Sequence, residues 1–217
     1  MLKTDWDWIK IVKPPKVYTI HDILSTNEIE RILAETNKLR YRVFFLTAYS
    51  MGLRLGEAIS LQLGDIDAEH KQVHIRRGKG HKDRLIPMPD FTYRALQVLW
   101  CKHHNPTFLF PSATGSPDTI RQAKTHMDRG GAQKALKVVL AECGIKKRIH
   151  IHSLRHSYAT HLLERGVSLQ QIQALLGHAS INSTLRYTQL TSVTQKDTQK
   201  VVNDLINSIQ IDLLRRP

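Results

Sequence analysis

A short interruption in a helical pattern constrains the fold of this chain more than any other feature. Apolar residues recur at helical spacing along most of the sequence, but after Gly64-Asp65 the period changes from 3.6 to 2. The alternating stretches 72–76 and 83–87 flank a basic, Gly-containing tip at 78–82, which is typical of a β-hairpin. A short strand near Ile66 is expected to complete the sheet. The sequence therefore predicts a mainly helical fold with a small antiparallel β-sheet.

Helix-start and helix-stop signals divide the rest of the chain. Ser25 stands three residues before Glu28, the spacing of a capping box, and apolar residues follow at helical spacing. Gly144 suits the left-handed residue that ends a helix. The polar segment from Pro111 to about Gly131 is expected to be a surface loop. Besides the helix that begins at Ser25 and a helical stretch after Pro89, we expect helices over about 41–50, 54–63, 132–143, 152–165, 169–176, 183–190 and 201–214.

The two ends of the chain differ from its middle. Residues 1–18 include the pair Pro14-Pro15, which disfavours regular structure and predicts a linker or arm. The main domain is expected over residues 19–190, and residues 191–217 form a tail with a helix. That helix docks either on its own core or on a neighbouring protomer, and both remain open. Its apolar stripe consists of Val201, Leu205, Ile209 and Leu213, with Val202 and Ile206 beside them.

The charge balance gives the first indication of a partner. Lys and Arg number 32 against 19 Asp and Glu, which leaves a net charge of +13 and a pI near 9.9. A polyanion such as nucleic acid is favoured as the partner. Charge alone is weak evidence, because many basic proteins use it only for solubility.

Cysteine usage and the lack of long apolar segments bear on the compartment. Cys101 and Cys143 lie far apart and are expected to be buried in helices, with no redox or metal role. The sequence shows no charged-then-apolar leader and no long apolar span. These features favour a reducing, cytoplasmic setting.

Two basic motifs in the first half of the chain carry candidate chemistry. Arg54 and Glu57 lie three apart at the beginning of a helix and share a face, where a surface ion pair is the ordinary explanation. The hairpin contains Lys79, Lys82 and Arg84. These side chains either contact a phosphate or are only exposed to solvent in a turn. Neither motif decides the function alone.

Two further motifs follow in the second half. His152 and Arg155 are one helical turn apart and can point at the same oxygen atoms. His156 follows His152 by four, but Ser153 stands where an HExxH zinc site needs Glu, so His156 and His161 are expected to pack or face solvent. Gly177-His178 precedes Tyr187, and a lone helical tyrosine is usually a half-buried core residue.

The order of these motifs closely resembles the tyrosine recombinase family, which includes phage integrases and the bacterial Xer proteins. The resemblance covers about residues 20–190 and rests on five blocks in sequence. It implies the family's DNA breaking-rejoining catalytic fold and site-specific DNA recombination. It also implies that Glu57 supports Arg54 and that Lys82 is the alternative to Lys79. The implied catalytic residues are Arg54, Lys79, His152, Arg155, His178 and Tyr187.

The chemistry of the family suits these residue types. Attack by Tyr187 would form a 3′-phosphotyrosyl link and release a 5′ hydroxyl, so that the bond energy is conserved without ATP. Arg54 and Arg155 would stabilise the transition-state charge that Mg²⁺ stabilises elsewhere, so neither a metal nor another cofactor is expected. Lys79 would protonate the departing 5′ oxygen, while His152 or the cationic cluster would activate the tyrosine. His178 would donate a hydrogen bond to a phosphate oxygen.

The resemblance also implies partners. The expected partner is double-stranded DNA, bound by a homo-oligomer of two to four chains that belongs to a mobile element and has no membrane association. The seat of a DNA phosphate is expected where Gly130-Gly131 precede a helix N-terminus. Residues expected to contact DNA are Lys82, Arg84, Arg121, Lys124 and Arg129.

Family members usually carry a separate helical DNA-clamping domain ahead of the catalytic one. A chain of 217 residues has no room for both, so residues 1–18 are expected to be a linker or a remnant of that region. Two rival functions remain: a non-catalytic DNA-binding or regulatory relative, and a strand-relaxing enzyme resembling type IB topoisomerases.

Overall fold

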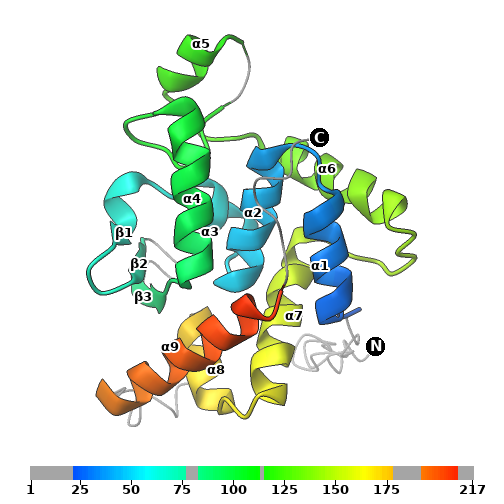
Figure 1. The fold of residues 1–217 in the computed structure, drawn as a ribbon, viewed down its shortest axis with the longest axis vertical. Coiled ribbons are helices and arrows are strands. Elements are labelled where there is room, and N and C mark those ends of the chain that lie inside the picture. Colours follow the sequence, from blue (N-terminus) through cyan, green and yellow to red (C-terminus); the bar gives the residue numbers. More distant parts are fainter. Residues whose placement is uncertain (1–21, 77–82, 113–114, 178–191, 210–217) are drawn as a thin grey trace, which may run out of the picture.

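Helix α2 (Leu39–Ser50) forms the centre of the molecule (Figure 1). The computed structural model describes residues 22–76, 83–112, 115–177 and 192–209. Every residue of α2 from Arg42 to Ser50 is buried. A helix buried on all sides needs neighbours all round. These neighbours are α1 (Thr26–Glu35), α3 (Leu55–Ile59), α4 (Asp90–His103) and α7 (Ile151–Glu164).

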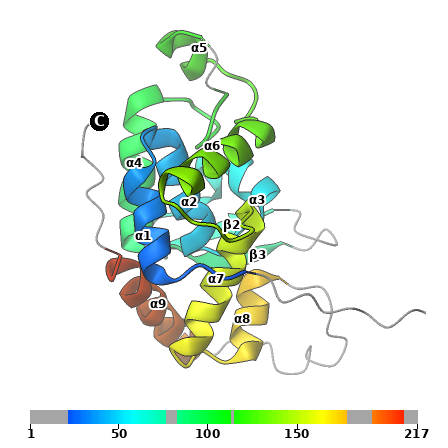
Figure 2. The ribbon, with the colours of Figure 1, turned by 90° about the vertical axis from the view of Figure 1, so that its right-hand side faces the viewer.

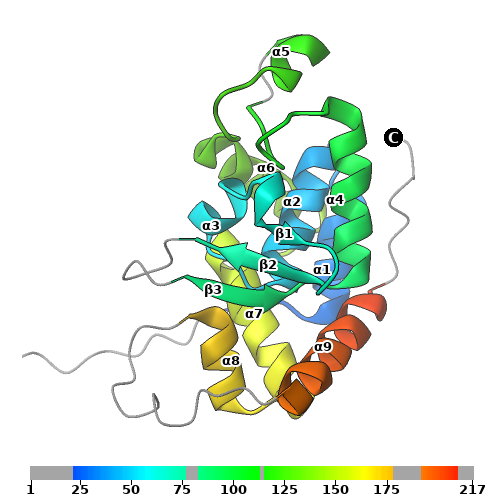
Figure 3. The ribbon, with the colours of Figure 1, turned by 90° about the vertical axis from the view of Figure 1, so that its left-hand side faces the viewer.

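The predicted small antiparallel sheet is confirmed. Strands β1 (Ile66–Asp67), β2 (Gln72–Ile75) and β3 (Arg84–Pro87) pair in the order β1-β2-β3 (Figure 3). The register pairs Val73 with Ile86 and Ile75 with Arg84. Val73, Ile75 and Ile86 are buried whereas Leu85 is 60% exposed, as the alternating pattern requires. The hairpin tip with Lys79 and Lys82 lies outside the described residues.

Local end signals place several helices as predicted. The capping box of α1 is present, because Ser25 Oγ accepts from Glu28 N at 3.2 Å and Glu28 Oε2 accepts from Ser25 N at 2.7 Å. Helix α8 spans Leu169–Leu176 and ends at Gly177. Gly144 has the predicted left-handed conformation, with φ +65°. The helix predicted over 183–190 lies outside the described residues.

Helix α3 is shorter than predicted. It ends at Ile59 rather than continuing to Leu63, and the 3₁₀ helix η2 (Leu63–Asp65) follows. The Ser60 hydroxyl donates to Gly56 O at 2.8 Å, a side-chain bond that competes with the helix. Beyond it, Leu61 O accepts from Leu109 N at 3.1 Å. The helix therefore ends where the backbone begins to hydrogen-bond with the distant segment around Leu109.

The polar segment before α6 is not a continuous loop. It contains α5 (Pro117–Arg121), which projects from one end of the molecule (Figures 1 and 2). Helix α6 (Arg129–Glu142) begins earlier than predicted, because Asp128 is its N-cap and accepts from Gly131 N at 2.7 Å. Gly130-Gly131 therefore lie inside the first turn. They do not precede the helix as predicted, and the Asp128 carboxylate already accepts from Gly131 N, one of the donors expected to bind a phosphate.

The tail helix α9 spans Ser192–Asn207, so it begins and ends earlier than predicted. It packs against α4, α7 and β3 of the same chain (Figures 1 and 3). Asp90 N also donates to Asn203 Oδ1 at 3.2 Å. The buried apolar residues of this segment are Val202, Leu205, Ile206 and Ile209. In this chain the described part of the stripe is covered by its own core.

Two smaller expectations concern the cysteines and membranes. Burial is confirmed for Cys143 and wrong for Cys101, which is exposed on α4. Within the described ranges, no helix combines the length and apolar character needed to cross a membrane.

Candidate active site

Three arginines surround one buried carboxylate at the beginning of α3. Glu57 is 9% exposed, and its Oε1 accepts from Arg54 Nη1 at 2.6 Å and from Arg84 Nη1 at 3.0 Å. Its Oε2 accepts from Arg84 Nη2 at 2.8 Å and from the backbone N of Arg54 at 2.9 Å. The nearest nitrogen of Arg155, Nη1, is 3.8 Å from Oε2. Four hydrogen bonds use about all of the acceptor capacity of a carboxylate.

The same arginines hold the C-terminal end of α8. The last carbonyls of a helix have no partner within it and carry partial negative charge, so cations are favoured there. Three consecutive carbonyls each accept from a different arginine: Leu175 O from Arg84 Nε (3.0 Å), Leu176 O from Arg155 Nη2 (2.5 Å) and Gly177 O from Arg54 Nη2 (3.2 Å). The cluster thus ties α3, β3 and α7 to the helix end.

Arg155 is the most deeply buried member of the cluster. Its side chain is 1% exposed, and its Nη1 donates to Gly52 O at 2.8 Å in the turn between α2 and α3. Its Nε has no hydrogen-bond partner among the described residues. Burial lowers the pKa of Arg155 to about 10, and the positive charges of Arg54 and Arg84 act in the same direction. The guanidinium therefore remains charged at neutral pH.

Glu57 is ionised despite its burial. Burial alone would raise its pKa, but hydrogen bonds from Arg84 and from the Arg54 backbone outweigh this effect and bring the pKa to about 2. Three guanidiniums then face one carboxylate, which leaves a surplus of two positive charges. Such a surplus favours an anion, and a phosphodiester matches the planar donors of arginine.

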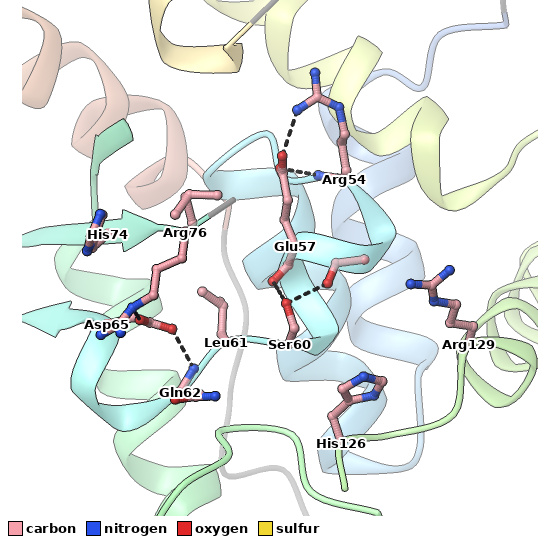
Figure 4. A pocket seen from close by; sticks show the side chains of 12 residues that line it. Arg54, Glu57, Ser60, Leu61, Gln62, Asp65, His74, Arg76, His126 and Arg129 are labelled. Atoms are coloured by element: carbon pink, nitrogen blue, oxygen red, sulfur yellow. Dashed lines mark hydrogen bonds and ion pairs between the residues drawn. The ribbon is translucent and has the colours of Figure 1, made fainter. Parts of the chain in front are cut away.

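A pocket of about 730 Å³ opens beside this cluster (Figure 4). Arg54 and Glu57 line one part of it, while Arg129 and His126 line another. Arg129 is exposed and comes from the first turn of α6. Pocket residues to which the sequence patterns assigned no role at a site include Ser60, Gln62, His74 and Arg76. They lie in separate parts of the sequence and come together only where α3 and the residues after it, strand β2 and the segment before α6 line the same pocket.

The residues expected to contact DNA are distributed unevenly. Arg129 lines the same pocket as Arg54. Arg121 and Lys124 are exposed but are not among its lining residues. Arg84 is expected to point outward and contact DNA, but its side chain is only 10% exposed. It donates hydrogen bonds to Glu57 and to Leu175 O instead. Lys82 belongs to the undescribed hairpin tip.

The structure describes three of the six predicted catalytic residues. The structure brings Arg54 and Arg155 together around Glu57. His152 is exposed in the first turn of α7, one turn before Arg155. Lys79, His178 and Tyr187 are outside the described residues.

The remaining histidines of α7 pack against other rings. The His156 ring lies edge-on to that of His152, with centroids 4.5 Å apart. His161 is buried, and its Nδ1 lies 2.8 Å from Tyr49 Oη. The described residues contain no group of three or more His, Cys, Asp or Glu side chains arranged to hold a metal ion.

Gly52 is a backbone position that the site requires to be glycine. Its φ is +58°, and an added Cβ would lie 2.6 Å from both Leu176 Cδ2 and Tyr158 Cδ1. We expect Gly52→Ala to lower the free energy of unfolding by about 2–4 kcal/mol, from left-handed strain and overpacking together. Denaturant unfolding measures the loss. Gly64→Ala is the control, because nothing lies within 4 Å of its added Cβ; equal losses in both variants would contradict the argument.

Comparisons with known proteins agree with this geometry. Residues 22–193 match the model described as "Phage integrase family". Tyrosine recombinase XerD of Listeria monocytogenes is 32% identical over 197 residues, which cover 88% of this chain and 66% of the relative. Tyrosine recombinase XerA of Pyrococcus furiosus is 34% identical over 203 residues, covering 91% of this chain and 68% of the relative. The chain thus spans about two thirds of the length of these curated relatives.

Solved structures share the fold. The crystal structure of XerA recombinase has a TM-score of 0.63 and 26% identity, covering 84% of this chain and 65% of that one. XerH site-specific recombinase, solved in a post-cleavage complex with a palindromic difH substrate, has a TM-score of 0.58 and 22% identity. This match covers 81% of the present chain and 51% of XerH, and it bears on the fold alone. Because the family model spans most of the sequence, this chain belongs to the phage integrase family of tyrosine recombinases.

Proposed function

We propose that this protein is a site-specific DNA recombinase that cleaves and rejoins DNA strands through a 3′-phosphotyrosyl intermediate. The observation that carries the proposal is the partly buried cluster of Arg54, Arg155 and Arg84 around Glu57. Its surplus of positive charge suits a phosphodiester whose charge grows in the transition state. The cluster also holds the end of α8, and His178 and Tyr187 follow that helix in the sequence.

The proposed reaction has two balanced steps. The Tyr187 hydroxyl loses its proton to His152, or to water while the positive charge of the cluster stabilises the phenolate, and its oxygen attacks phosphorus. The bond from phosphorus to the 5′ oxygen breaks, and Lys79 gives the departing oxygen a proton. A 5′ hydroxyl of another strand then attacks the phosphotyrosine and restores both the phosphodiester and the tyrosine. Arg54, Arg155 and His178 bind the non-bridging oxygens in each step.

The proposal includes the DNA partner, the assembly and the cellular setting of this reaction. The partner is double-stranded DNA, on which two to four copies of the chain assemble, and the protein acts in the cytoplasm as part of a mobile element. The net charge of +13 supports a DNA partner, and XerH, whose fold this chain shares, has been solved on a difH substrate. Residues 19–190 act as the catalytic domain, 1–18 as a linker, and 191–217 as a tail that also contacts a neighbouring protomer.

A nicked suicide DNA duplex tests the reaction class. Cleavage near the nick releases a short fragment, so the covalent intermediate accumulates and migrates as a protein–DNA adduct in a denaturing gel. We expect the protein on the 3′ phosphate, without ATP and in the presence of EDTA. A protein that binds DNA but never forms an adduct would be a non-catalytic relative. Relaxation of supercoiled plasmid without strand exchange would indicate a topoisomerase.

DNA affinity is expected to depend more on Arg129 than on Arg121 or Lys124. Arg129 lines the pocket beside Arg54, whereas the other two lie elsewhere. Arg129→Ala should weaken binding at moderate salt, and it should reduce the slope of log affinity against log salt by about 1, the value for one lost phosphate contact. Fluorescence anisotropy over a salt series measures both. An Arg121→Ala/Lys124→Ala double variant that weakens binding more than Arg129→Ala would contradict the pocket as the DNA path.

A further inference from the structure

We infer that Arg84 is a positioning residue of the active site, which holds Glu57 and the end of α8 in register so that Arg54 and Arg155 face the phosphate. This inference rests on the proposed function. Arg84 comes from the first residue of β3, next to the hairpin tip, and lies 27 positions from Glu57 in the sequence. Its side chain is 10% exposed, so it belongs to the interior of the site rather than to its DNA-facing surface.

The first part of the argument concerns the carboxylate. Arg84 donates one hydrogen bond to each oxygen of Glu57, at 3.0 Å and 2.8 Å. Together with the two bonds from Arg54 these use about the whole acceptor capacity of the carboxylate. Arg155 is consequently left 3.8 Å away and donates instead to Gly52 O and Leu176 O. Without Arg84, the carboxylate would have free lone pairs with which to draw Arg155 out of this position.

The second part concerns α8. Arg84 Nε donates to Leu175 O, the first of the three carbonyls that accept from the cluster. The arginine also lies against the backbone of Gly177, where an added Cβ would meet Arg84 Cδ at 2.9 Å and Nη1 at 3.1 Å. Gly177 has φ +60°, which ends the helix and favours glycine. Arg84 therefore sets where the helix stops, one residue before His178.

Lysine cannot replace this arginine, although it keeps the charge. Arg84 uses Nε, Nη1 and Nη2 on three acceptors that belong to two elements. A lysine ammonium is a single point with no planar fork, so it cannot span both Glu57 oxygens and Leu175 O. Arg84→Lys thus removes the three-way hydrogen bonding to Glu57 and Leu175 O and keeps the positive charge.

Arg42 provides a matched control. It is also a buried arginine, 6% exposed, and its Nε donates at 3.0 Å to Thr36 O, the carbonyl that follows α1. Arg42→Lys removes a comparable contact at a helix end away from the cluster. Any effect common to both variants is therefore structural.

The experiment measures three quantities on the full chain: the single-turnover rate of adduct formation on saturating suicide duplex, the affinity for that duplex, and amide hydrogen exchange over residues 169–177. We expect Arg84→Lys to slow adduct formation on the order of 10- to 100-fold, as small misplacements of catalytic groups do. Affinity should change by less than about threefold, because a buried arginine contributes little to DNA attraction at the surface. Exchange at the end of α8 should accelerate. Arg42→Lys should leave all three quantities unchanged in the folded protein.

The outcomes separate this inference from the proposed function. If the wild type forms an adduct and Arg84→Lys forms it equally fast, the inference is overturned and the function stands. If affinity and rate fall in parallel and the salt slope decreases, Arg84 is a phosphate ligand and the positioning role is overturned. A wild type that forms no adduct overturns the function, and the inference with it.

Discussion

Tyr187→Phe is expected to abolish the covalent protein–DNA adduct, with a loss on the order of 10⁴-fold or more. Removing the nucleophile leaves no group that can form the phosphotyrosyl bond, and losses of this size are typical when an enzyme's nucleophile is deleted. DNA affinity should remain within about twofold, because phosphate contacts by the basic residues supply most of it. The measurement is adduct formation on the nicked suicide duplex, followed over hours with the label on the 5′ side of the cleaved bond, in the fragment that keeps the 3′ phosphate.

Tyr93→Phe is the matched control for this change. Tyr93 is a partly buried helical tyrosine that packs against the core, which is the ordinary role that a tyrosine such as Tyr187 would have without chemistry. The control should form adduct at the wild-type rate. An adduct that persists in Tyr187→Phe would exclude Tyr187 as the nucleophile.

Glu57→Ala is expected to lower the free energy of unfolding by about 3–5 kcal/mol, the cost of breaking a buried ion pair by removing one partner. The variant leaves three guanidiniums close together with no counter-charge, and Arg155 among them is 1% exposed. Denaturant unfolding followed by circular dichroism measures the change. Asp67→Ala is the control: its ion pair with His70 is on the surface and is screened by water, so its loss should cost much less than the loss of Glu57. Similar losses in both variants would mean that the cluster needs no counter-charge.

The same carboxylate predicts a dependence of stability on pH. The pKa of Glu57 in the folded protein is about 2, below its usual value of 4.5. Its ionised form therefore contributes stability that is fully present above pH 4.5 and is lost as the pH falls through 2. We expect the difference in unfolding free energy between the wild type and Glu57→Gln to shrink over this range. A difference that stays constant down to pH 2 would show that the charge of Glu57 is not what stabilises the cluster.

Features that depend on neighbouring residues could be predicted from the sequence. The capping box of α1, the end of α8 at Gly177 and the pairing of β2 with β3 each rest on side chains or turns close together in the chain. The order of the motifs also indicated the family, which the match over residues 22–193 confirms. Predictions failed where a distant segment intervened: α3 stops where Leu61 O binds Leu109 N. The start of α6 is an exception, because its Asp128 N-cap is a local signal and yet the predicted start lies three residues too late.

The sequence by itself determined which charged residues this protein has and how the motifs succeed one another. Only the tertiary structure decided which of them meet. The sequence groups Arg84 with the hairpin tip as a DNA contact, yet its side chain turns inward onto Glu57, because β3 packs against α8 and this packing brings the guanidinium to the carboxylate. Arg129 joins Arg54 at one pocket, while Arg121, eight positions earlier, does not line it. The physical reason is that periodicity and capping act over about one helical turn, whereas a buried charge cluster exists only when packing brings its members together and removes water from them.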